Sequence, residues 1–221
     1  MKRKHILTIL SLSLLTLFSC SKDNYDEPES ELTGTIVFNG QAIGLRQTDE
    51  AVQMQLWQDG YELYTAIPIY VTQEGTFSAK LFNGTYKLVS RDKNGPWINS
   101  RDTVIVTVSG RTNIEYPVKP YYTISDEKYQ IVGDSLIATF NVNKANGDET
   151  IEYVRLFINK TKFVDIGTNV RSVDAQQKTT GSNRIAMKIS DRSDKYLFAR
   201  IGVKTSGIDH LIYTAGSEQV K

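Results

Sequence analysis

Short runs of alternating apolar and polar residues fill most of the chain beyond its N-terminal segment. In the clearest run, Val52, Met54 and Leu56 alternate with two glutamines and Trp57. A period of two places successive side chains on opposite faces of a β-strand. Most runs stop at turn-forming pairs such as Asn39-Gly40, and none shows a clear helical period. The pattern therefore predicts an all-β protein.

Seven such runs predict a first antiparallel β-sandwich that spans residues 32–119. The third run contains Pro68, which marks an edge or bulged strand because proline cannot donate a hydrogen bond to a neighbouring strand. Asn-Gly and Asp-Gly pairs between runs suit type I′ hairpin turns, in which both central residues need a positive φ. Pro117 and Pro120 indicate a stiff boundary at the end of this domain. The predicted strands are 32–38, 52–57, 61–71, 76–82, 85–90, 101–108 and 111–118.

A second group of runs predicts another sandwich over residues 120–221, of the immunoglobulin or fibronectin-III type and without disulfides. Residues 121–142 hold three candidate strands, and the run 152–158 alternates partly out of phase, which indicates a bulge. Residues 159–182 are polar and give no clear element. The alternative is one unbroken β-sandwich of double length. The remaining predicted strands are 184–189, 196–203 and 211–213.

The first twenty residues have the pattern of a signal peptide, and their end resembles the bacterial lipoprotein box. Three basic residues precede an apolar run over 6–18 and then Cys20. This run is shorter than the roughly 20 apolar residues that cross a bilayer, but it fits a secretory signal. A thiol at this position can carry a lipid, and each buried acyl CH₂ contributes about 0.8 kcal/mol to anchoring. We therefore predict lipidation of Cys20, with an ordinary signal peptide as the alternative.

Residues 21–31 are acidic, contain Pro28 and have almost no apolar side chains. Such a segment cannot bury enough surface to fold by itself, so we expect a flexible tether. An acidic cluster directly after a lipidated cysteine resembles the surface-export signal of Bacteroidetes lipoproteins. This resemblance implies a lipid-anchored outer-membrane protein that faces the cell exterior. The alternative is a solvated linker on a protein that faces the periplasm.

Charge and cysteine content narrow the classes of function. The chain has 26 basic and 25 acidic side chains, and removal of Lys2, Arg3 and Lys4 with the signal leaves 23 against 25, a net charge of −2. Such a near-neutral protein gives no electrostatic case for binding nucleic acid. Because Cys20 is the only cysteine, the folded part forms no internal disulfide. No segment after the signal is long and apolar enough to be predicted to cross a membrane.

Several strings in the first predicted domain stand out: Leu32-Thr33-Gly34, Leu56-Trp57-Gln58-Asp59-Gly60, Gly75-Thr76-Phe77-Ser78, Leu81-Phe82-Asn83-Gly84-Thr85-Tyr86-Lys87, and Asn94-Gly95-Pro96-Trp97 followed by Asp102-Thr103-Val104. Together they resemble a family of Bacteroidetes outer-membrane lipoproteins that contain a domain of unknown function. That domain has a transthyretin-like or carboxypeptidase-regulatory-like sandwich, so the resemblance implies this fold for the first domain. The resemblance covers the signal and residues 31–120 well and the remainder more loosely.

Members of that family are typically encoded beside starch-utilisation-type outer-membrane importers and their substrate-binding lipoproteins. The resemblance therefore implies an accessory role in nutrient capture. The partners it implies are the importer, its substrate-binding lipoprotein and a glycan or peptide. The family has no assigned activity, so the resemblance transfers no catalytic residue.

The sequence offers few groups for catalysis. His5 belongs to the predicted signal, so His210 is the only histidine of the mature chain, and it follows Asp209 in a predicted turn. One histidine cannot supply a zinc site, and neither a nucleophile elbow nor a Gly-rich phosphate loop is present. We therefore predict a non-catalytic protein without a metal or other cofactor.

Carboxylate pairs are the remaining candidates for chemistry, and all of them lie in predicted turns. Glycosidases need two carboxylates that converge on one bond, whereas adjacent residues of a strand or turn usually diverge. Asn143, Asn146, Asp148 and Glu149 offer oxygen ligands for calcium, but their spacing matches no loop motif. We therefore interpret the carboxylates as solvated turn residues. The pairs are Asp126-Glu127, Asp148-Glu149 and Asp191 with Asp194.

Four aromatic residues are candidates for ligand binding: Trp57, Tyr61, Tyr64 and Trp97. Sugars stack their C–H faces on aromatic rings, while amides and carboxylates bind their hydroxyls. Trp57 shares the polar face of its strand with two glutamines, and Trp97 follows Gly-Pro in a polar loop. The alternative is that both tryptophans cover the sandwich or the contact between the domains. We expect Tyr121-Tyr122 to pack at that contact.

These observations lead to one principal hypothesis and two alternatives. We predict a non-catalytic surface lipoprotein that serves an outer-membrane importer of glycans or peptides, by binding substrate weakly or by docking on the transporter. A purely structural spacer that contacts only proteins is the first alternative. A hydrolase that depends on a carboxylate is the second.

Overall fold

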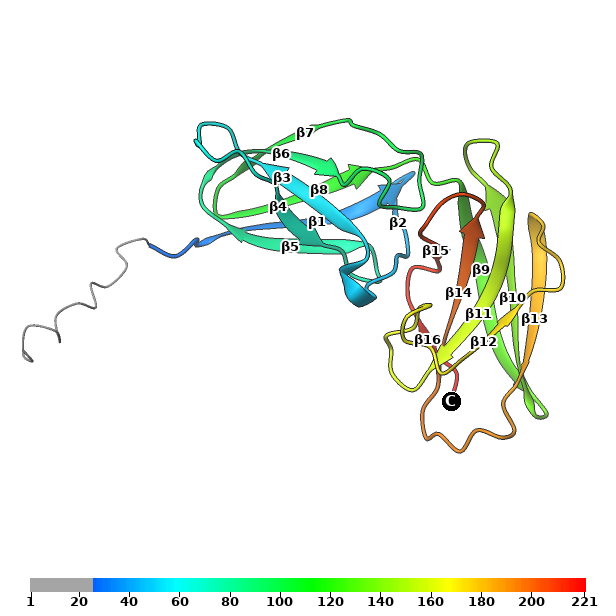
Figure 1. Cartoon of the computed structure of the whole chain (residues 1–221). Coiled ribbons are helices and arrows are strands. Elements are labelled where there is room, and N and C mark those ends of the chain that lie inside the picture. Colours follow the sequence, from blue (N-terminus) through cyan, green and yellow to red (C-terminus); the bar gives the residue numbers. More distant parts are fainter. Residues whose placement is uncertain (1–25) are drawn as a thin grey trace, which may run out of the picture.

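Two pairs of β-sheets make up residues 26–221, the part of the chain that the computed structural model describes (Figure 1). Each pair forms a sandwich, so the predicted all-β fold of two consecutive domains is confirmed. Cys20, the rest of the predicted signal and residues 21–25 lie outside the described residues. The first strand begins at Ser30, two residues earlier than the predicted tether allows. Among residues 26–221, no helix has the length and apolarity that a membrane span requires.

The N-terminal sandwich consists of two four-stranded sheets. In one sheet, β1 lies between β5 and β8 and also pairs with the short β2, while the other has the order β4-β3-β6-β7. The parallel pairing of β1 with β8 corrects the prediction of a fully antiparallel sandwich. These are the first and last strands of the domain, so no hairpin sets their relative direction. The strands are β1 (Ser30–Phe38), β2 (Gln41–Ala42), β3 (Gln53–Trp57), β4 (Ile67–Tyr70), β5 (Thr76–Leu81), β6 (Gly84–Ser90), β7 (Val104–Val108) and β8 (Arg111–Pro117).

Local sequence explains most strand limits in this domain. Met54 and Leu56 are fully buried on the inner face of β3, while Gln53, Gln55 and Trp57, which alternate with them, are partly exposed. Pro68 lies in β4, an edge strand that pairs only with β3, as predicted. The predicted strand 61–71 shortens to β4 because residues 61–66 form a largely exposed loop. Alternation therefore predicts which face a residue occupies better than it predicts where a strand begins.

The C-terminal sandwich packs the three-stranded sheet β13-β10-β9 against a five-stranded sheet, in which β16 joins the order β12-β11-β14-β15. Residues 121–142 lie mainly in two long strands rather than the three predicted, because a bulge at Asp126 bends β9 without ending it. The predicted bulge in β11 is confirmed by a register shift between Ile151 and Tyr153. The sequence pattern does not predict β12 or β16. The strands are β9 (Tyr122–Val132), β10 (Ser135–Lys144), β11 (Ile151–Asn159), β12 (Arg171–Asp174), β13 (Gly181–Lys188), β14 (Phe198–Thr205), β15 (Ile212–Tyr213) and β16 (Glu218–Gln219).

Polar contacts join the two domains around Arg200 of β14. Its fully buried guanidinium donates to the carbonyls of Thr214 and Val164 in the C-terminal domain and of Leu45 and Gln73 in the N-terminal domain, at 2.6 to 3.3 Å. Burial lowers the pKa of Arg200 to about 10, so the side chain stays charged at neutral pH. A cation held by carbonyls from both domains fixes how the domains sit against each other.

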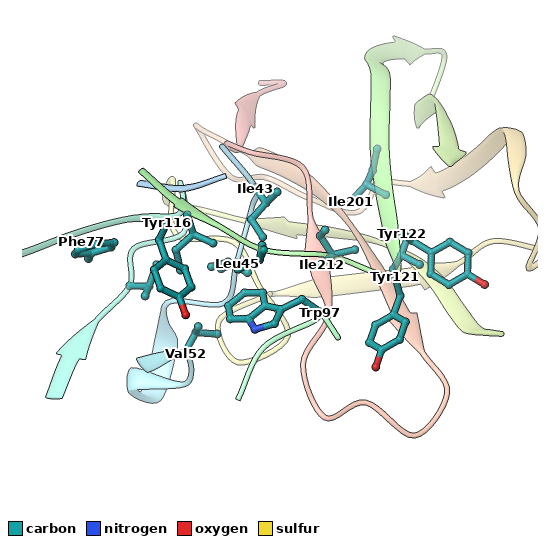
Figure 2. Packing of buried hydrophobic residues seen from close by; sticks show 14 of the residues in the cluster. Ile43, Leu45, Val52, Phe77, Trp97, Tyr116, Tyr121, Tyr122, Ile201 and Ile212 are labelled. Atoms are coloured by element: carbon teal, nitrogen blue, oxygen red, sulfur yellow. The ribbon is translucent and has the colours of Figure 1, made fainter. Parts of the chain in front are cut away.

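Further contacts extend this domain junction. The backbone of Gly44 pairs with that of Tyr213, and the hydroxyl of Thr48 donates to the buried carboxylate of Asp165 at 2.8 Å. Buried apolar residues from both domains form one continuous cluster, part of which is shown around Trp97 in Figure 2. The two sandwiches therefore share one hydrophobic core and are not joined by the linker alone.

Candidate functional site

Trp57 ends β3 on the outer face of the sheet β4-β3-β6-β7. Its neighbours across β6 and β7 are Lys87 and Ile105, so these three side chains form a row over that face. Leu88 and Val106, which follow Lys87 and Ile105 in the sequence, are buried on the opposite face of the sheet. Trp57 itself is partly exposed. The prediction that Trp57 lies on the polar face of its strand is therefore confirmed.

Tyr64 packs beside Trp57, and we call this pair the platform. The two ring centroids are 5.0 Å apart, and the ring planes are inclined by 33°. Tyr64 is 49% exposed and Tyr61 is 61% exposed. Both tyrosines lie in the β3–β4 loop, drawn in cyan at the end of the N-terminal domain that faces away from the C-terminal domain (Figure 1). The structure thus brings three of the four predicted ligand-binding residues to one end of one sheet.

Polar side chains border the platform. Lys87 donates to Asp59 at 2.8 Å, and this pairing lowers the pKa of Asp59 and raises that of Lys87. Gln55 lies two residues before Trp57 on the same face, roughly 7 Å along the strand. Its amide has no hydrogen-bond partner among residues 26–221 and can both donate and accept. A sugar ring stacked on Trp57 would therefore meet an amide and an ion pair at its edges.

Trp97 does not join the platform. It is only 4% exposed and lies in the β6–β7 loop, where its backbone pairs with Pro120 of the domain linker. Its ring lies directly over Gly95, at which a Cβ would come within 2.2 Å of ring atoms. Tyr121 and Tyr122 are buried at the same junction, as predicted. Trp97 therefore covers the contact between the domains, which is the alternative that the sequence leaves open, and it also lines a groove there.

His210 has a structural partner in the other domain. It lies in the β14–β15 loop, within 3.2 Å of Nδ2 of Asn94. The amide of Asn94 is oriented by two backbone bonds, since Nδ2 donates to Ala51 and Oδ1 accepts from Gln53. Nδ2 is thus a donor, and Nε2 of His210 is an unprotonated acceptor. Burial lowers the pKa of His210, which agrees with a neutral ring.

Three of the six carboxylates predicted to lie in turns are held by local partners. Asp126 accepts from Asn141, and this bond lowers its pKa. Arg171 lowers the pKa of Asp191 to about 2, and two cationic neighbours lower the pKa of Asp194. A general acid needs the opposite shift. Within residues 26–221, no three His, Cys, Asp or Glu side chains gather closely enough to hold a metal ion.

Sequence reasoning misses Lys87 and Ile105, which lie far from Trp57 along the chain. Only the register of β3, β6 and β7 places them beside it. The sequence does indicate that each of the two side chains faces outward, because each occupies an exposed position in the alternating pattern of its own strand. The order of the strands, which turns three outward positions into one row, is not a local property.

Solved structures share this fold over most of the chain. A DUF3823 family protein from Parabacteroides merdae is 41% identical, with a TM-score of 0.84 over 89% of this chain and 100% of that chain. One from Bacteroides ovatus is 31% identical, with a TM-score of 0.79 over 86% and 98%. A structure from Bacteroides uniformis, described as a "putative carbohydrate binding protein", is 18% identical, with a TM-score of 0.70 over 88% and 99%. This last likeness shows the fold alone.

Family models cover both domains in order. Residues 30–119 match the N-terminal domain of a protein of unknown function, DUF3823, and residues 122–218 match a domain of unknown function, DUF3823_C. No protein of curated function matches the chain. With both domains matched and a relative 41% identical along its whole length, this chain belongs to the DUF3823 family.

Proposed function

We propose that this protein is a non-catalytic lipoprotein of the outer-membrane surface that binds a glycan weakly at the platform and serves a nutrient importer. The observation that carries the proposal is the contact of Trp57 with Tyr64 on an open sheet face. Large aromatic rings left at a surface are candidates for contact with a ligand or partner. A stacked sugar ring would cover them without any bond being broken.

The surroundings of the platform suit a sugar better than a purely apolar ligand. Gln55 has an amide without a partner in the described part of the chain, and the Asp59–Lys87 pair is exposed. These groups can exchange hydrogen bonds with hydroxyls while the ring covers Trp57. Tyr61 is exposed in the same loop and is the candidate for contact with a further sugar of a longer chain. The surface is open on one side, so we expect weak binding.

The location and partners rest on the sequence. Lipidation at Cys20 and an acidic segment after it support an anchored protein that faces the cell exterior. The importer of glycans or peptides, and its substrate-binding lipoprotein, are the partners that this setting suggests. Labelling the native protein with palmitate tests the anchor. A detergent pull-down followed by mass spectrometry tests the importer, whose consistent absence would reject the accessory role.

Affinity electrophoresis against a panel of polysaccharides tests the platform. We expect at least one polysaccharide to retard the wild-type protein, and Trp57→Ala or Tyr64→Ala to weaken that retardation by at least about tenfold, equivalent to about 1.4 kcal/mol. Tyr196→Ala is the matched control, because Tyr196 is 47% exposed but lies in the other domain. Retardation that both platform variants leave unchanged would contradict glycan binding here.

A structural spacer is the second candidate, and the domain junction favours it. Arg200 ties both sandwiches together through buried carbonyls, which suits a protein that holds partners at a set distance. This role predicts no retardation by any polysaccharide, together with capture of the same partner proteins by the wild type and by Trp57→Ala.

A further inference from the structure

The domain junction contains a groove that lies apart from the platform. Its volume is about 610 Å³, within the range of small-molecule sites. The walls come from the end of β1, the β6–β7 loop, the end of β8 and the linker after it, together with Asn146 of the C-terminal domain. The groove is therefore complete only when both domains are docked.

The floor of the groove is apolar and its rim is polar. Its aromatic part comes from the partly exposed Phe38 and from Trp97 and Tyr116, each 4% exposed. Four exposed polar side chains stand on the rim, and the amide of one of them, Asn99, is bonded to Lys93 and Asp92. The other three groups are the amide of Asn39, the carboxylate of Asp102 and the ammonium of Lys119. None of the three side chains has a hydrogen-bond or ion-pair partner within residues 26–221. They are therefore available to a ligand without breaking any bond inside the protein.

Backbone and side-chain bonds hold the groove in shape. Asn146 donates to the carbonyl of Pro120 at 2.9 Å, which ties the C-terminal domain to the linker. The amide of Ile98 donates to the carbonyl of Lys119 at 2.9 Å, which ties the β6–β7 loop to the same linker. A site that is already ordered costs a ligand little conformational entropy.

One of the lining residues also has a donor without a partner. The Nε1–H of Trp97 has no acceptor in the described part of the chain. The nitrogen is not sealed from solvent, unlike the hydroxyl of Tyr129, which is buried without a partner. Buried indole N–H groups usually find a hydrogen-bond acceptor. The acceptor for Trp97 must come from water or from a bound molecule.

We propose that this groove binds a short, uncharged oligosaccharide. The floor takes the C–H face of a sugar ring, while Asn39, Asp102, Lys119 and the N–H of Trp97 bond to its hydroxyls. Asp102 and Lys119 carry opposite charges, so the rim has no net charge with which to select phosphate or a polycation. The proposal goes beyond the platform, because it requires no binding at Trp57.

The two tryptophans make the test specific, since the chain has no others and each lies in one site. In the Trp57→Phe variant, Trp97 is the only source of indole fluorescence. The variant is titrated with maltohexaose, cellohexaose, xylohexaose and mannohexaose up to about 10 mM, roughly tenfold above a millimolar Kd. We expect at least one of these sugars to change the emission of Trp97 saturably.

Rim variants in the same Trp57→Phe background separate binding from a general solvent effect. Asp102→Ala combined with Lys119→Ala should weaken the response at least tenfold, and Asn39→Ala should weaken it independently. The matched control is Asp148→Ala combined with Lys128→Ala, which removes the same two residue types from exposed positions off the groove. The control should respond as the parent does.

The outcomes distinguish this proposal from the one made for the platform. A Trp97 response that the rim variants weaken supports the groove, even if Trp57→Ala leaves the retardation by polysaccharides unchanged. The absence of a saturable response to all four sugars, or a response that survives the rim variants, overturns the groove and leaves the platform untouched.

Discussion

The platform and the domain junction each contain one of the two tryptophans, and the two surroundings differ in kind. Trp57 rests on the outward face of one sheet, with Tyr64 from the adjoining loop as its aromatic partner. Trp97 lies between two domains, over Gly95 and beside the linker. The first site belongs to a single sandwich, whereas the second needs both. Perturbing the junction should therefore damage the groove and spare the platform.

The difference also shows how each ring comes to be exposed or buried. Trp57 follows the alternation of β3, so its exposure is a property of a few neighbouring residues. Trp97 lies in a loop without alternation, and its burial depends on groups distant in sequence. A polar loop around a tryptophan therefore says little about whether its ring meets solvent.

The largest expected effect is at Arg200. Arg200→Met removes the guanidinium from four buried carbonyls. Within residues 26–221 and outside the strand ladders, only the carbonyl of Gln73 keeps another donor, the amide of Leu45, so we expect the free energy of unfolding to fall by about 3–5 kcal/mol. Urea denaturation measures the loss. Arg184→Met, at an exposed position of β13, is the matched control and should stay within about 0.5 kcal/mol. Equal stability of the two variants would show that Arg200 does not hold the domains together.

Gly95→Ala should have the next largest effect, and it should act on one tryptophan only. The added Cβ would lie 2.2 Å from the ring of Trp97, so the ring must shift at a cost of about 1–3 kcal/mol. Thermal unfolding gives the loss of stability, and the emission of Trp97 in the Trp57→Phe background should move to longer wavelength. Gly216→Ala is the control, because a Cβ there meets no atom within 4 Å. An unchanged emission would mean that the ring is not held over Gly95.

Fluorescence quenching compares the two tryptophans directly, with little effect on stability. Acrylamide should quench the wild-type protein in two components, because Trp57 is partly exposed and Trp97 is 4% exposed. Trp57→Phe should remove the accessible component and change the free energy of unfolding by less than about 1 kcal/mol. A variant that remains as readily quenched as the wild type would show that Trp97 is as accessible to the quencher as Trp57.

The smallest expected effect is a pH dependence that arises at the junction. The folded-state pKa of His210 lies below 6.5 because burial disfavours the charged ring. Between the folded-state pKa and 6.5, the ordinary pKa of histidine, the unfolded chain binds more protons than the folded one. The free energy of unfolding should therefore fall as the pH falls below 6.5 and level off below the folded-state pKa. His210→Gln should remove this part of the pH dependence. Urea midpoints of both proteins from pH 7.5 to 4.5 measure it, and parallel curves would contradict a neutral His210.

Much of the fold could be predicted because strands and turns leave local traces. Pro68 indicates the edge strand β4, and the imperfect alternation near Tyr153 indicates the bulge in β11. β12 could not be found in this way, since its four residues include no buried position. The bulge at Asp126 was equally hidden, because an extra residue in a strand looks like the gap between two strands.

The candidate sites were predictable only in part, for a related reason. Trp57, Tyr61 and Tyr64 are close in sequence, so their meeting at one end of a sheet follows from one strand and one loop. Asn39 and Lys119 line the same groove only because the ends of β1 and β8 lie side by side there. Parallel pairing of the first and last strands of a domain leaves no local signal.

The amino-acid sequence by itself determined the strand-forming pattern, the division into two consecutive sandwiches and the side of β3 on which Trp57 lies. Each of these depends on the alternation of side chains over a few residues. Tertiary structure alone decided which strands are neighbours, that Trp97 is buried, and that Arg200 joins two domains through four carbonyls. Alternation specifies a face and carries no information about what covers it, so sites built between distant segments appear only when the chain is folded.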